Sequence, residues 1–115
     1  MQRDPRMWLW DVREAAQAIA SFVVGLDVNA YAQSALVHSA VERKFEVIGE
    51  ALNQLSKADA TLAQRVPHLP QIVAFRNQLI HGYALVDHDT VWGVVQQSLP
   101  ELQAAVVALL AELEP

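Results

Sequence analysis

Apolar residues recur at alternating steps of three and four positions along almost the whole chain, and this spacing constrains the fold most strongly. A helix turns by about 100° per residue, so such a spacing gathers the apolar side chains into one stripe. Patterns typical of strands are nearly absent. The chain has 115 residues, 53% of them apolar, which suffices for one domain with a real core. The sequence therefore predicts a single all-α domain over residues 1–115.

Helix boundaries follow from capping residues, glycines and prolines. Asp4 and Pro5 predict a first helix start, and Gly25 a stop. A second helix is expected over about residues 29–57, a short one within 59–65 and another over about 70–82. The last helical region is expected to begin at a cap formed by Asp87 or Asp89. Pro100 interrupts this last region, where 98–101 also resembles a capping box, but the stripe continues in phase and favours a kink over a restart. Long helices joined by short loops predict an antiparallel up-and-down bundle of four to five helices.

Composition and charge restrict the classes of function. The chain has no cysteine, which excludes disulfides, thiolate zinc sites and a cysteine nucleophile and suits a reducing cytoplasm. We find no signal peptide and expect no stretch that crosses a bilayer, so a cytoplasmic protein without a membrane partner is predicted. The net charge is −5, and no Lys or Arg follows Arg76. Any contact with nucleic acid must therefore be local, depend on a dimer or use a partner's charge.

The stretch 74–83 carries the most informative chemistry. Arg76 is a permanent cation whose planar fork suits phosphate oxygens, and His81 can move a proton near neutral pH. Asn77 can hold a ring or a phosphate with its amide. Together these groups could cleave RNA without a metal. The histidine would activate the 2′-hydroxyl or protonate the leaving oxygen, and the arginine would offset charge on the phosphorus.

Helical geometry limits how these side chains can meet. Asn77 and His81 are four residues apart and share a face, but Arg76 and His81 differ by roughly 140° on an ideal helix. They converge only if the helix ends before His81 or if a second copy of the chain faces the first. We therefore predict a homodimer with the motif helix at its centre. A capping and ion-pair network is the alternative interpretation, and spacing alone favours it.

Three sequence blocks resemble the HepT-like branch of the HEPN superfamily. Arg76, four residues, His81, one residue and Tyr83 match the superfamily's Arg-x4–6-His-x-Tyr motif, with Asn77 after the arginine. The stretch 45–51, Phe-Glu-Val-Ile-Gly-Glu-Ala, is similar to that branch's "EIIGEA" segment. The residues that follow the motif, Val86-Asp87 and Val91-Trp92, also fit its downstream pattern, so the resemblance covers about residues 40–102.

The resemblance implies an all-helical dimer that acts as a metal-independent endoribonuclease. It also implies the toxin role in a two-gene toxin–antitoxin module whose other member is a small MntA-like nucleotidyltransferase. Arg76 and His81 would be the catalytic pair, with Asn77 in support. Tyr83 would be the residue that the partner adenylylates to silence the toxin. The alternative function is a non-catalytic helical binding module, an adaptor for a nucleotide or a nucleotidyltransferase, which the acidic charge favours.

Other polar groups have spacings that suit a supporting role at the site or metal binding. Glu42, Glu46 and Glu50 form a row of carboxylates four residues apart, and we expect Glu46 or Glu50 to reach the Arg76 region. His38 and Glu42 have a spacing that can hold a metal, but with no third ligand in the sequence we expect a surface pair, no metal site and no cofactor. His88 near a helix start is not expected to carry a charged role.

Overall fold

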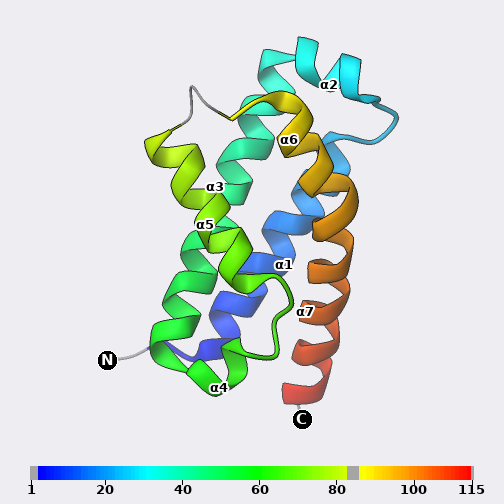
Figure 1. Ribbon diagram of the computed structural model, residues 1–115. Helices are drawn as coiled ribbons and strands as arrows, with labels where there is room; N and C mark the ends of the chain where they lie inside the picture. The colour runs from blue at the N-terminus through cyan, green and yellow to red at the C-terminus, as the bar shows by residue number, and fades with distance from the viewer. Residues whose placement is uncertain (1–2, 83–85, 115) are drawn as a thin grey trace.

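The computed structural model describes residues 3–82 and 86–114, which form an all-α bundle without a strand in these ranges (Figure 1). Its long segments run alternately up and down, so the predicted architecture is confirmed. The elements are α1 (Pro5–Phe22), α2 (Val28–Gln33), α3 (Ala35–Ala58), α4 (Ala60–Ala63), α5 (Leu69–His81), α6 (His88–Gly93), a π-helical turn (Val94–Ser98) and α7 (Leu99–Leu113). The last three follow one another as one helix.

The order of packing places α5 at an edge of the bundle. α3 packs against both α1 and α5, and α1 packs against α7, whereas the main contact of α5 is with α3. α5 buries Leu69, Ile72, Phe75 and Leu79 against the bundle. Its other side remains exposed and includes Ile80, at 36% exposure, and His81. The helix that carries the sequence motif therefore has a free flank.

Aspartates start the first and last helices, as the sequence predicts. An Asp4 carboxylate oxygen accepts a hydrogen bond from the backbone N–H of Arg6 at 3.0 Å. Asp87, rather than Asp89, caps α6, because its Oδ1 accepts from the backbone N–H of Thr90 at 2.7 Å. This backbone hydrogen bond lowers the pKa of Asp87 below its ordinary value. Both caps satisfy helix N–H groups that otherwise have no partner.

The prediction of one continuous helix over 29–57 is wrong at Ser34. There the backbone is extended, and the Ser34 hydroxyl accepts a hydrogen bond from the N–H of Val37 at 3.2 Å. Serine competes with the helix backbone in this way, so it ends α2 and begins α3. Because of the break, α2 crosses the end of the bundle and packs against α6, and it buries Tyr31 there completely.

The last helix absorbs Pro100 through a change in hydrogen bonding. Pro100 has no N–H, and the preceding turn is π-helical, with the Leu99 N–H donating to the Val94 carbonyl. Ser98 makes no side-chain cap, so the helix continues and the capping-box alternative is wrong. The joined helix His88–Leu113 has 26 residues and is long and apolar enough to span a bilayer, contrary to the sequence expectation. In this structure its apolar stripe packs against α1.

The core between α3 and α5 centres on two aromatic rings. Phe45 is fully buried, and its ring meets that of Phe75 edge to face, with centroids 5.3 Å apart and planes at 82°. Such pairs add to the stabilisation from apolar burial. Phe75 directly precedes Arg76, so this contact also fixes the start of the motif.

Phe45→Ala should lower the free energy of unfolding by about 3–5 kcal/mol, because it leaves a cavity in the core. Phe22→Ala makes the same change at a residue that is 37% exposed and should cost less than about 1 kcal/mol. Urea denaturation of the two variants measures the difference. Equal losses would contradict this account of the core.

Candidate functional site

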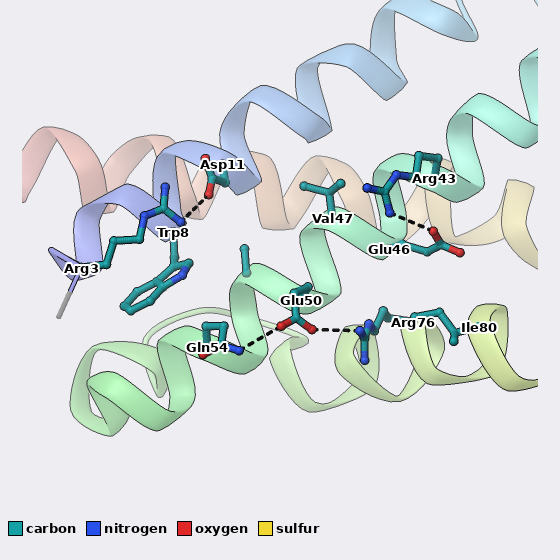
Figure 2. Close-up of a pocket in the computed structure, with 11 residues that line it drawn as sticks. Arg3, Trp8, Asp11, Arg43, Glu46, Val47, Glu50, Gln54, Arg76 and Ile80 are labelled. Atoms are coloured by element: carbon teal, nitrogen blue, oxygen red, sulfur yellow. Dashed lines mark hydrogen bonds and ion pairs between the residues drawn. The ribbon is translucent and has the colours of Figure 1, made fainter. Parts of the chain in front are cut away.

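A groove of about 400 Å³ opens between α1, α3 and α5 and carries the motif arginine (Figure 2). Its lining is rich in charged side chains from three helices and the segment before α1. The charged members are Arg3, Asp11, Arg43, Glu46, Glu50 and Arg76. Trp8, Val47 and Ile80 supply apolar surface beside them. The groove therefore combines phosphate-binding cations with carboxylates.

Arg76 lies across Gly49, where α3 and α5 approach each other closely. A Cβ atom added to Gly49 would overlap the Cβ of Arg76 and lie only 2.6 Å from its Cγ. Only glycine leaves room for the arginine stem at this point. The stem is therefore pinned between the helices, and the Arg76 side chain is only 23% exposed.

Glu50 holds the guanidinium at the end of that stem. Its Oε2 lies 2.9 Å from Nη2 of Arg76, and its Oε1 accepts a hydrogen bond from Nε2 of Gln54 at 2.9 Å. Figure 2 shows Glu50 between these two partners. The hypothesis that one glutamate of the acidic row reaches Arg76 is thus confirmed for Glu50. Glu46 pairs instead with Arg43, at 3.2 Å.

The groove is electrically balanced. Arg3 pairs with Asp11 at 2.9 Å, in addition to the two pairs that Arg43 and Arg76 form with glutamates (Figure 2). Each of the three lining arginines therefore already faces a carboxylate. A phosphate that enters must compete with these carboxylates, unless a partner adds positive charge.

Asn77 and His81 also lie on α5, on the C-terminal side of Arg76. The Arg76 Nη1 donates to Oδ1 of Asn77 at 3.1 Å, and Asn77 itself is exposed. His81 is the last residue of α5 and is exposed. Because the helix continues through His81, an early helix end does not bring it round to Arg76. Tyr83 lies outside the described residues.

Three features escaped the sequence interpretation, two of them at the groove and one outside it. Gly49 stands in the middle of a 24-residue helix, where glycine costs roughly 1 kcal/mol relative to alanine. A glycine that is kept inside a helix despite this cost usually has a packing reason, so Gly49 could have indicated a close approach of two helices. Gln54 gave no such signal, because a glutamine on a half-buried helix face is common. A third feature, the position of His88 beside His38 and Glu42, also follows only from the fold.

Comparisons with known proteins assign most of the chain to one family. Residues 12–109 match the family described as Ribonuclease HepT-like. The chain belongs to the HepT-like ribonuclease family. This match encloses Gly49, Glu50, Arg76 and His81, so the HepT-like region includes the part of the groove that α3 and α5 form.

Curated relatives share nearly the full length of this HepT-like chain. MJ0125 of Methanocaldococcus jannaschii, named as a candidate RNase, is 30% identical over 98% of the chain and 97% of its own length. MJ1216 of the same organism, named likewise, is 29% identical over 98% of the chain and 93% of its own length. A protein of Thermococcus cleftensis, named as a candidate ribonuclease HepT, is 28% identical over 90% and 93%. No solved structure matches the chain significantly.

Gly49→Ala tests the close approach of the two helices. The new methyl group overlaps the Arg76 stem, so the helices must separate, and we expect a loss of about 1–3 kcal/mol in unfolding free energy. Gly93→Ala is the matched control, because a Cβ there meets nothing within 4 Å. It should be neutral or stabilise the fold by up to about 1 kcal/mol. If the two variants had equal stability, the contact between Gly49 and Arg76 would not limit how large a side chain position 49 can carry.

Proposed function

We propose that this HepT-like protein is a metal-independent endoribonuclease whose catalytic groups are Arg76 and His81. The observation that carries the proposal is the preorganised arginine, pinned over Gly49 and held by Glu50 at an open groove. The family match and the RNase names of the relatives support RNA as the substrate class. Such an arginine is a rigid donor toward charge that develops on phosphorus.

The chemistry needs one proton-transfer group and one charge-stabilising group. The 2′-hydroxyl of RNA attacks the neighbouring phosphorus, the bond to the 5′-oxygen breaks, and a cyclic phosphate and a free 5′-hydroxyl result. His81 is exposed and can take the proton from the attacking hydroxyl or give one to the leaving oxygen. Arg76 stabilises the charged oxygens of the transition state, and Asn77 supports its guanidinium.

Arg76 and His81 act across a homodimer in this proposal. Their side chains point about 140° apart on a continuous helix, so the two side chains of one chain do not meet. α5 is an edge helix with a free flank, and Ile80 exposes apolar surface between these two residues. A two-fold axis beside α5 would bring Arg76 of one protomer toward His81 of the other. The second copy would also add its own cations to a groove that is neutral in one chain.

The protein acts as the toxin of a HEPN/nucleotidyltransferase toxin–antitoxin module in the cytoplasm. Its antitoxin is an MntA-like nucleotidyltransferase that adenylylates Tyr83 and silences the nuclease. Tyr83 follows His81 by two residues and Gly82 by one, so the added AMP would place a negative phosphodiester near the end of the motif helix. The added group would block RNA by charge and by bulk.

A second candidate function is a non-catalytic module that binds a nucleotide or a nucleotidyltransferase. The balanced groove favours it, because every lining arginine of the groove already has a carboxylate partner. In that case the Arg–His–Tyr cluster would serve recognition alone. Catalysis separates the two candidates directly.

Purified protein should cleave single-stranded RNA in excess EDTA. Arg76→Ala and His81→Ala should each lower the rate by at least about 100-fold, since each removes a group that acts in the transition state. His68→Ala is the control, because His68 lies at the other end of α5 beside Glu101 and should leave the rate unchanged. Cleavage of a labelled RNA and the intact mass of each protein are measured together.

Absence of cleavage at unmodified mass would overturn the nuclease proposal in favour of the binding module. Absence of cleavage with added AMP mass would instead indicate a silenced enzyme, and phosphodiesterase treatment should then restore the activity.

Glu50→Gln should lower kcat about tenfold without raising KM, because the ion pair that orients Arg76 is lost while the shape remains. Glu46→Gln removes a neighbouring carboxylate that pairs with Arg43 and should leave kcat within about twofold. Steady-state kinetics of both variants give the comparison. If kcat changed in neither variant, or changed by the same factor in both, Glu50 would have no special part in positioning Arg76.

A further inference from the structure

Two histidines and a glutamate converge at the opposite end of α3 from Lys57. His38 and Glu42 lie one turn apart on α3, and His88 is the first residue of α6. One ligand atom of each residue lies within 4.8 Å of those of the other two. The imidazole rings of His38 and His88 are 4.1 Å apart between centroids, with planes at 31°. The fold thus brings His88, a third possible metal ligand that the sequence spacing alone did not reveal, to His38 and Glu42.

Polar atoms at this cluster lack partners. Tyr31 is completely buried and meets both imidazoles edge-on, with ring centroids 6.2 Å from His38 and 6.1 Å from His88. Among the described residues, neither its hydroxyl nor Nδ1 of His38 has a hydrogen-bond partner, although both atoms are buried. Burial, and then the charge of Glu42, raise the pKa of Tyr31 above its ordinary value. Buried polar atoms without partners are rare in native proteins and call for an explanation.

We propose that His38, Glu42 and His88 bind one Zn²⁺ ion. Two imidazoles and a carboxylate are a donor set that zinc accepts with a water in the fourth position. In a zinc tetrahedron with bonds of about 2.0–2.1 Å, neighbouring donor atoms are about 3.4 Å apart. Nδ1 of His38 and Oε2 of Glu42 already stand at 3.5 Å, which is long for a hydrogen bond and suits that edge. The other two distances between ligand atoms are at most 4.8 Å, and all three side chains are only partly buried, so small side-chain rotations can bring the atoms to the tetrahedral spacing.

The proposed ion joins two helices that the chain places on either side of the motif. His38 and Glu42 hold the beginning of α3, and His88 holds the beginning of α6, which follows the motif segment. Glu42 precedes Glu50 by eight residues, or about 12 Å along the helix. The ion would therefore stabilise the frame of the fold and not take part in the groove that holds Arg76. The inference does not rest on the ribonuclease proposal.

Titration of the metal-free full chain with Zn²⁺ tests the site. Calorimetry should give one ion per chain with a Kd at or below about 1 µM. Zinc at a hundredfold excess over Kd should raise Tm by about 10 °C. Co²⁺ in place of zinc should give visible d–d bands of four- or five-coordinate metal.

His88→Gln and Glu42→Gln should each weaken zinc binding at least about tenfold while Tm in EDTA stays close to that of the wild type. His68→Gln is the matched control, because His68 also faces a carboxylate, with its Nε2 2.6 Å from Oε2 of Glu101, but outside the cluster. It should leave the affinity for zinc unchanged.

Three results would overturn the proposal. The first is that no 1:1 binding is detected below about 100 µM zinc. The second is that the wild type and both cluster variants bind zinc with equal affinity, and the third is that His68→Gln lowers the zinc affinity as much as the cluster variants do. Because the two cluster variants alter different helices, a folding defect in one leaves the other as a test. Circular dichroism in EDTA identifies such a defect.

Discussion

The close approach of α3 and α5 at Gly49 is the constraint on which the site depends. With glycine there, the stem of Arg76 lies directly on α3, and its guanidinium reaches Glu50 one residue further along. The edge-to-face contact of Phe45 with Phe75 fixes the same two helices next to that point. Packing and electrostatics therefore act together. The core sets the register of α5 on α3, and the register decides which glutamate of the acidic row pairs with the arginine.

Charge balance limits how strongly the groove of a single chain can attract a phosphate. Positive charge in the groove is neutralised pairwise in one copy of the chain, which is why the proposed function draws further affinity for RNA from a second copy. A second copy across α5 would supply both His81 and additional cations to the same groove. In the proposed mechanism, one negative charge added at Tyr83 would shift this balance further against RNA. The proposed dimer and the proposed silencing by adenylylation would then both act through the charge of this groove.

Apolar spacing was enough to predict the bundle, because four amphipathic stripes with short connections leave few alternatives. It did not reveal the break at Ser34, where a serine hydroxyl replaces a backbone bond, nor the π turn that absorbs Pro100. In the site, spacing identified the acidic row but could not choose Glu50 over Glu46. The meeting of His88 with His38 depends on how α6 returns across α3, which no local pattern encodes.

Mixing two inactive variants tests the shared site most directly. Arg76→Ala and His81→Ala protomers are combined under conditions that exchange subunits, and RNA cleavage in EDTA is followed. If each site takes its arginine from one protomer and its histidine from the other, half of the dimers are mixed and each has one intact site. Activity should then return to about a quarter of the wild-type value. Activity that stays at the level of the separate variants, despite demonstrated subunit exchange, would contradict a site built across the dimer.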